Sequence, residues 1–147
     1  MDKIKAYGVC IYKIKGNTTK ILLCKSVKSQ EKWGCLKGMS LRFEEPKDCA
    51  RREFFEESSI KVSTDVFEEY FEQTNKTKDV GIWLVNAKNV EDIEDFFYED
   101  TLGNNYLSWE NSKVKFFNID KLPEIKTKQK MLIQEIKSFL KNKSQSR

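Results

Sequence analysis

Residues 46–58, with the sequence PKDCARREFFEES, are predicted to form a helix, and they constrain the fold and the function more than any other segment. Pro46 suits the first turn of this helix because its missing N–H would have no helical partner there. Glu53, Glu56 and Glu57 then share an arc of about 100° on one helix face. Such like-charge neighbours repel by about 0.2–0.5 kcal/mol per pair. A solvated acidic face and a cation-binding face are both compatible with this pattern.

The segments before this helix have the pattern of β-strands. Residues 6–14 and 20–26 are rich in β-branched and aromatic side chains, and the turn signal Gly16-Asn17 lies between them. This arrangement predicts a β-hairpin. Residues 28–45 contain two glycines, and we expect a loop there that leads into the helix.

More strand-like runs follow the helix, at residues 67–74, 79–87 and 113–119. Residues 90–100 are acidic and aromatic, and a short helix and a loop are both open interpretations. In residues 126–142 the apolar side chains fall on one helical face, which predicts a closing amphipathic helix. These side chains are Leu132, Ile136, Phe139 and Leu140. The order strands, helix, strands, helix predicts an α+β fold, an α/β/α sandwich with one central mixed sheet flanked by helices.

The length of 147 residues suits one domain over residues 1–147, with a frayed tail at 142–147. No apolar run approaches the roughly 18 residues of a membrane span, and the N-terminus lacks the apolar region of a signal peptide. We therefore expect a cytoplasmic protein without a membrane partner, and its oligomeric state, monomer or homodimer, is open. The net charge of +4 is too small to indicate nucleic-acid binding by itself. The lysine-rich stretch from Lys121 to Arg147 is compatible with a solvated helix face and with a site for an anionic ligand or RNA.

The absence of histidine removes several kinds of chemistry from consideration. Without histidine, nucleophilic catalysis by a Ser-His-Asp or Cys-His pair is excluded. The four cysteines form no CxxC pair, which argues against a zinc site and a disulfide framework, so we expect buried reduced thiols. Catalysis would therefore depend on carboxylates, lysines, tyrosines or a metal ion. Hard divalent cations such as Mg²⁺ prefer carboxylate oxygens, and Arg52 is placed to hold one carboxylate by a bidentate pair.

Residues 38–60 resemble the Nudix box of the Nudix hydrolases. The family pattern is Gly, five residues, Glu, seven residues, Arg-Glu, an apolar residue, any residue, Glu-Glu, any residue, Gly and an apolar residue. Eight of its nine fixed positions are matched, by Gly38, Glu44, Arg52, Glu53, Phe54, Glu56, Glu57 and Ile60. Ser59 stands where the family has glycine, and Phe43 precedes Glu44 where many members have glycine. Neither departure changes a charged position.

The resemblance implies a Nudix-like fold and hydrolysis of a nucleoside diphosphate linked to another group, with Mg²⁺ or Mn²⁺ as the metal. By position, Glu53, Glu56 and Glu57 resemble the metal-ligating carboxylates, and the carbonyl of Gly38 is a further ligand. Arg52 and Glu44 resemble the pair that orients these carboxylates. The chemistry needs no histidine, because metal ions neutralise the phosphate charge and lower the pKa of bound water.

Three residues outside the helix have expected roles that follow from the same resemblance. Glu110, six residues before Phe116, resembles a carboxylate that other members use as an additional metal ligand or as the general base; Glu99 and Asp100 are weaker alternatives. Lys37 is expected to contact a phosphate. Trp33 is either a core residue or a platform for a base. The alternative interpretation of Glu110 is an ordinary solvent-exposed loop residue without a catalytic role.

The stretch WGCLKG at residues 33–38 resembles the entry to the box in hydrolases of dinucleoside polyphosphates, diphosphoinositol polyphosphates and capped RNA. We therefore expect a dinucleoside polyphosphate or an RNA 5′-end polyphosphate as the substrate. An NDP-sugar such as ADP-ribose and a free (d)NTP are the alternatives. A non-catalytic nucleotide-binding module and a purely structural acidic-helix protein are the remaining classes, and dependence on Mg²⁺ would separate them from an enzyme.

Overall fold

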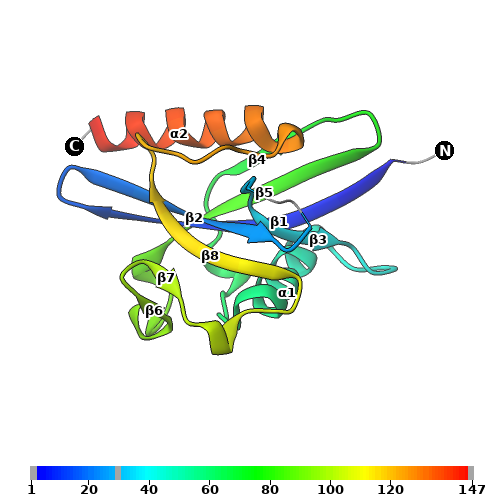
Figure 1. The fold of residues 1–147 in the computed structure, drawn as a ribbon. Helices are drawn as coiled ribbons and strands as arrows, with labels where there is room; N and C mark the ends of the chain where they lie inside the picture. Colours follow the sequence, from blue (N-terminus) through cyan, green and yellow to red (C-terminus); the bar gives the residue numbers. More distant parts are fainter. Residues whose placement is uncertain (1–2, 29–30, 146–147) are drawn as a thin grey trace.

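The computed structural model describes residues 3–28 and 31–145 and contains a mixed β-sheet with a long helix on each face (Figure 1). The strands are β1 (Ile4–Lys15), β2 (Thr18–Ser26), β3 (Leu36–Met39), β4 (Tyr70–Gln73), β5 (Lys78–Asn86), β6 (Phe97–Tyr98), β7 (Thr101–Leu102) and β8 (Asn111–Asn118). The helices are α1 (Pro46–Ser58) and α2 (Lys130–Gln145). Single 3₁₀ turns lie at Thr64–Val66, Ala87–Asn89, Ile93–Phe96, Asn104–Tyr106 and Thr127–Gln129. The predicted α+β fold with a central mixed sheet is confirmed.

The sheet has the order β4-β5-β1-β2-β8-β7-β6, and only β1 and β5 pair in parallel. On its other edge, β1 has two antiparallel partners. Its first half pairs with β3, with Tyr7 opposite Gly38, and its last residues pair with β2, with Tyr12 opposite Ile21. The sheet therefore forks between β3 and β2, and a single bridge between Cys24 and Gly34 joins the two branches again.

Each face of the sheet carries its own apolar core. Alternate residues of a strand point to opposite faces, so Val9 and Ile11 pack with Phe54 of α1, whereas Cys10 and Tyr12 lie on the face of α2. The second core includes the apolar stripe expected on the closing helix, with Leu132, Ile136 and Leu140 fully buried. The two cores therefore hold α1 and α2 on opposite faces of the sheet.

The hairpin, helix α1 and the last strand agree with the sequence predictions. Gly16 has a φ of +63° between β1 and β2, a conformation that glycine adopts without steric cost. Residues 90–100 contain a 3₁₀ turn followed by β6 and its turn into β7, so they are neither a regular helix nor only a loop. The four cysteines are free and buried, as predicted. No helix in the described part of the chain is long and apolar enough to span a membrane.

Three predicted boundaries are wrong. The expected loop at 28–45 contains β3, which the sequence does not reveal because its four residues are ordered by pairing with β1. Residues 67–69 precede β4 and are not part of the strand. The closing helix begins at Lys130 and continues to Gln145, so residues 142–145 are helical where a frayed tail was expected. Residues 146–147 lie outside the described residues.

Candidate active site

Helix α1 presents its glutamates at different depths because one of its faces is packed on the sheet. Phe54 is fully buried there. This orientation leaves Glu56 exposed, places Glu53 at partial burial and buries Glu57, whose exposed fraction is 8%. The helix ends at Ser58, and the capping residue Ser59 has a φ of 66° and donates its N–H to Phe55 O at 2.8 Å. This left-handed position is the one that glycine most often occupies at helix ends.

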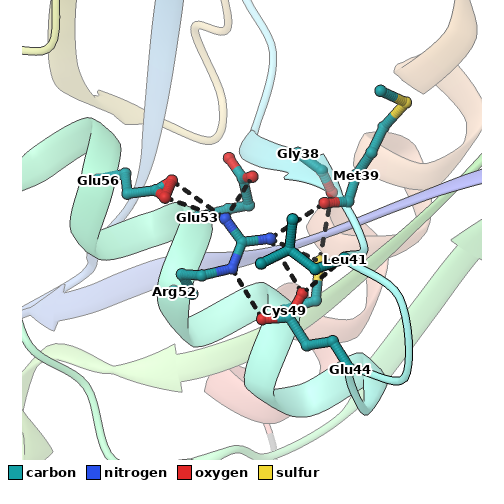
Figure 2. Close-up of polar contacts among 8 residues, drawn as sticks. All are labelled: Gly38, Met39, Leu41, Glu44, Cys49, Arg52, Glu53 and Glu56. Atoms are coloured by element: carbon teal, nitrogen blue, oxygen red, sulfur yellow. Dashed lines mark hydrogen bonds and ion pairs between the residues drawn. The ribbon is translucent and has the colours of Figure 1, made fainter.

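Arg52 is the centre of the polar network on α1 (Figure 2). Its guanidinium forms a bidentate pair with Glu44, from Nε to Oε2 at 2.7 Å and from Nη2 to Oε1 at 3.0 Å. Nη1 donates to Glu53 at 2.9 Å and to Glu56 at 3.0 Å, and Nη2 also donates to the carbonyl of Met39 at 3.1 Å. One side chain therefore connects the loop glutamate, two helix glutamates and the end of β3.

Glu44 anchors this network to the loop before α1. Besides Arg52, its carboxylate accepts the N–H of Leu41 at 3.0 Å. The hydrogen bond from Arg52 lowers the pKa of Glu44 to about 2, and the N–H of Leu41 acts in the same direction. Glu44 is therefore ionised at neutral pH and paired. Glu44 and Arg52 form a close pair, and the supporting role expected for them stays a prediction.

Gly38 and Glu53 are in direct contact across the gap between β3 and α1. A Cβ added to Gly38 would lie 2.0 Å from Cδ of Glu53, so a larger residue would displace the carboxylate. The carbonyl of Gly38 accepts a weak hydrogen bond from Cys49 Sγ at 3.5 Å. The absence of a side chain at residue 38 thus lets a carboxylate and a backbone carbonyl approach each other.

Glu57 is a buried carboxylate with one unsatisfied oxygen. Its Oε1 accepts from Asn111 Nδ2 at 3.0 Å, whereas Oε2 is buried without a hydrogen-bond partner. Burial raises the pKa of Glu57 to about 7, while the hydrogen bond from Asn111 acts in the opposite direction. A buried, unpaired carboxylate oxygen is costly, and a bound cation is one way to satisfy it.

A cavity of about 230 Å³ lies beside Glu57 at the fork of the sheet. Lys37 of β3 and Lys126 of the segment before α2 line it together with Glu57. Lys28 and, just before β8, Trp109 and Glu110 also line it, and Trp109 is 82% exposed. The structure therefore brings the predicted residues Lys37, Glu57 and Glu110 to one cavity. Trp109, Asn111 and Lys126 were missed, because only the fold brings their segments to α1.

Some predicted residues lie elsewhere. Trp33 is 8% exposed and packs edge-on against Phe117 in the core on the α2 face, so it offers little surface to a base. Asp100 lies at the turn between β6 and β7, where it forms salt bridges with Lys13 and Lys20 of the β1–β2 hairpin. Glu99 belongs to the same turn. These ion pairs engage Asp100 with the hairpin and not with α1.

The donor set fits a hard divalent cation, although the carboxylates do not converge on one point. Within residues 3–28 and 31–145, no three Asp, Glu, Cys or His side chains are arranged closely enough to hold a metal ion. The physical reason is that Glu53 and Glu56 are turned toward Arg52, while Glu57 faces Asn111. The unpaired Glu57 Oε2, the helix carboxylates and the Gly38 carbonyl are nevertheless the oxygen ligands that Mg²⁺ and Mn²⁺ prefer.

The fold and site together define a class of protein: an α+β domain that presents helix glutamates, oriented by an arginine, at a fork in a mixed sheet. A family model for the NUDIX domain matches residues 4–140, and the chain belongs to this family. It is accordingly a Nudix-type pyrophosphohydrolase, and members of this family generally use a divalent metal ion. No curated protein matches the chain by sequence.

Several solved structures share the fold. An Ap4A hydrolase of C. elegans, in a binary complex, is 21% identical, with coverage of 95% of this chain and 98% of that chain and a TM-score of 0.61. A NUDIX hydrolase of Nitrosomonas europaea is 18% identical, with coverage of 96% and 72% and a TM-score of 0.66. An ADP-ribose pyrophosphatase of Streptococcus suis is 15% identical, with coverage of 91% and 92% and a TM-score of 0.60. At these identities the likeness establishes the fold alone.

Proposed function

We propose that this protein hydrolyses a pyrophosphate bond in a dinucleoside polyphosphate, with Mg²⁺ or Mn²⁺ bound at the glutamates of α1. The observation that carries the proposal is the composition of the 230 Å³ cavity. Its lining contains the carboxylates of Glu57 and Glu110 together with the lysines Lys28, Lys37 and Lys126. Carboxylates are needed for a metal ion, and lysines bind phosphate as point charges. A substrate that contacts both the metal ion and the lysines must contain a chain of phosphates.

Glu53, Glu56 and Glu57 would hold the metal, with the Gly38 carbonyl and Glu110 as further ligands. When bound, the ion neutralises phosphate charge and lowers the pKa of a water molecule. Arg52 acts on the carboxylates and not on substrate: its guanidinium spreads over Glu44, Glu53 and Glu56, which fixes their positions on the helix. Gly38 leaves the space that the Glu53 carboxylate occupies beside β3.

Glu110 is the proposed general base. It is exposed at the cavity, and its charge acts on both Glu53 and Glu57 by raising their pKa. Its backbone carbonyl accepts the N–H of Val27 at 2.9 Å, which fixes the residue at the mouth of the cavity. In the reaction, a water oxygen forms a bond to phosphorus, Glu110 takes the water proton, and the bridging oxygen leaves with its electron pair on the departing phosphate. Lys37 would bind the phosphate chain equally in the ground state and the transition state.

The choice of substrate class rests on phosphate-binding groups. The stretch WGCLKG resembles the entry to the box in hydrolases whose substrates contain a polyphosphate bridge. Lys37 within this stretch lines the cavity together with Lys126. Trp109 offers an exposed indole for stacking of a base. An RNA 5′ end, an NDP-sugar such as ADP-ribose and a free (d)NTP are the competing substrates. Four free thiols support a cytoplasmic location as part of the same proposal.

Product analysis by mass spectrometry tests this proposal. The panel contains diadenosine tetraphosphate, ADP-ribose, a dNTP and a 5′-triphosphorylated RNA oligonucleotide, each with Mg²⁺, with Mn²⁺ and with EDTA, in water enriched in ¹⁸O. We expect metal-dependent cleavage with the highest kcat/KM for diadenosine tetraphosphate, and ¹⁸O in one phosphate product. A higher kcat/KM for ADP-ribose would overturn the substrate class, and turnover in EDTA would overturn the metal dependence.

A Glu110→Gln variant tests the base in the same assay. Loss of the base should lower kcat and flatten the acidic limb of the pH–rate profile, because that limb reports the base gaining its proton. Lys37→Ala serves as the comparison and should mainly raise KM, because a phosphate contact made in ground and transition states alike contributes uniform binding. An unchanged kcat and acidic limb in Glu110→Gln would assign the base to another carboxylate.

A further inference from the structure

Four lysines from three separate segments lie near enough to act on one another, and two of them, Lys37 and Lys126, line the cavity. Lys37 lies on β3, Lys78 opens β5, and Lys126 and Lys128 precede α2. The strand register places the first two on the same face of the sheet. Lys37 lies opposite Gly8 and Lys78 opposite Ile4, and these two β1 residues are four positions apart. Because side chains alternate along a strand, both lysines point to the face that α2 covers.

Amide side chains that the proposed reaction does not use hold these segments together. The amide nitrogen of Asn75 donates to the carbonyls of both Lys78, at 2.9 Å, and Lys128, at 3.1 Å. Gln129 is 2% exposed and accepts the N–H of Cys35 at 2.7 Å, two residues before Lys37. These hydrogen bonds fix the backbone beside three of the four lysines.

Lys126 is fixed in the same way. Its N–H donates to the carbonyl of Trp33 at 3.0 Å, and the N–H of Trp33 donates to Glu124 at 2.9 Å. The segment before α2 therefore runs alongside the segment before β3. Buried polar groups are satisfied by these bonds, so the convergence of the lysines is a built feature of the fold and not a chance of side-chain placement.

The charges of these lysines act on one another, and the carboxylate of Glu57 offsets this repulsion only in part, by raising the pKa of Lys126. Within the described residues, none of the four lysines forms a salt bridge. The charge of Lys37 lowers the pKa of Lys78, with burial and the charges of Lys128 and Lys126 acting in the same direction. Burial lowers the pKa of Lys126, and the charge of Lys37 adds to this effect. Such mutual repulsion is relieved when an anion binds between the groups.

We propose that Lys37, Lys78, Lys126 and Lys128, here called the lysine track, bind the phosphates of the substrate that lie beyond the cleaved pyrophosphate. The inference rests on the proposed function and refines it, because it makes phosphate-chain length the property that the enzyme selects. Lys37 and Lys126 line the cavity with Glu57, and Lys78 and Lys128 continue the positive charge past it. The substrates favoured by this arrangement carry an extended phosphate run, and an NDP-sugar, with only two phosphates, cannot reach the whole track.

The first test measures binding in the absence of catalysis. Calorimetry in EDTA at about 0.15 M salt, where the Debye length is about 8 Å, compares inorganic pyrophosphate with linear tripolyphosphate and longer polyphosphate. The variants are Lys78→Gln and Lys128→Gln. Lys88→Gln is the matched control, because Lys88 lies just beyond the opposite end of β5 and carries the same charge. We expect each track variant to weaken tripolyphosphate binding about threefold to tenfold, and the control to change it less than twofold.

The second test measures turnover of diadenosine polyphosphates with three to six phosphates. In the track variants, kcat/KM should fall more for each added phosphate, while ADP-ribose turnover changes less than twofold. Equal losses at all chain lengths, or equal losses in Lys88→Gln, would overturn the lysine track. Failure of the wild-type protein to bind tripolyphosphate would overturn it as well. A different result would contradict the proposed hydrolysis, namely the absence of turnover in the wild-type protein. The binding measurement would still test the lysine track in that case.

Discussion

Glu57 differs from the other residues of α1 because it is both charged and buried. Its pKa of about 7 lies above the ordinary value of 4.5, so in metal-free protein the folded state releases this proton later than the unfolded state as pH rises. The contribution of Glu57 to the free energy of unfolding is therefore full below pH 4.5 and is lost as pH rises to about 7. The shift corresponds to roughly 3 kcal/mol.

The first prediction concerns the stability of Glu57→Gln in EDTA. Glutamine cannot ionise and can still accept from Asn111, so the variant should be up to roughly 3 kcal/mol more stable than wild type at pH 8 and similar to it at pH 4.5. Urea unfolding at both pH values measures this difference. Glu56→Gln, at an exposed position of the same helix, is the control and should show a smaller change. Equal pH dependence in wild type and Glu57→Gln would contradict the burial argument.

The second prediction concerns Arg52, whose planar guanidinium group donates hydrogen bonds to three carboxylates and one carbonyl. Arg52→Lys keeps the charge but loses the bidentate pair with Glu44. Mg²⁺ affinity should fall about tenfold or more, as is typical when a residue that orients metal ligands is changed. Substrate KM at saturating metal should change little. Metal affinity by calorimetry and KM by steady-state kinetics separate the two roles, and a large change of KM alone would place Arg52 against the substrate.

At the scale of elements, the loop from β3 to α1 carries a strained residue. Phe43 has a φ of 66° and is 91% exposed. A bulky side chain in this left-handed region costs about 1–2 kcal/mol, and its exposure leaves little packing to offset that cost. The third prediction is that Phe43→Gly raises the free energy of unfolding by about 0.5–1 kcal/mol, after the extra entropy of glycine in the unfolded chain is subtracted.

Phe43→Ala is the matched control because it removes the ring and keeps the strained backbone. Its free energy of unfolding should stay within about 0.5 kcal/mol of wild type. Urea unfolding of the three proteins measures the effect. If Phe43→Gly were no more stable than Phe43→Ala, the ring would be packing against something that offsets the strain.

Local signals account for the elements that the sequence predicted. Gly16-Asn17 marks the hairpin turn, and Pro46 marks the first turn of α1, because both act within a few residues of themselves. Strand β3 depends on its pairing with β1, about thirty residues earlier in the chain, and its four residues carry no periodic signal of their own. The same limit applies to Trp109, whose exposure beside the cavity follows from the position of β8.

At the scale of the whole molecule, the fork in the sheet explains why one cavity receives groups from both faces. The side of α1 supplies Glu57, and the side of α2 supplies Lys37 and Lys126. The sequence predicts Glu57, because the glutamates of α1 lie within the motif at residues 38–60, and the family resemblance also gives Glu110 and Lys37 expected roles. Lys126 is brought to the cavity by the backbone hydrogen bond from its N–H to the carbonyl of Trp33, and no spacing in the sequence reveals this contact between distant segments.

The central claim is that the carboxylates of α1 hold the metal that hydrolysis of the phosphate chain requires. The most direct test is kcat for diadenosine tetraphosphate at saturating Mg²⁺, in wild type and in Glu57→Gln with unchanged thermal unfolding cooperativity. We predict a fall of at least about 10²-fold, because a missing ligand removes charge stabilisation from the transition state. Near-normal turnover in Glu57→Gln would contradict the account.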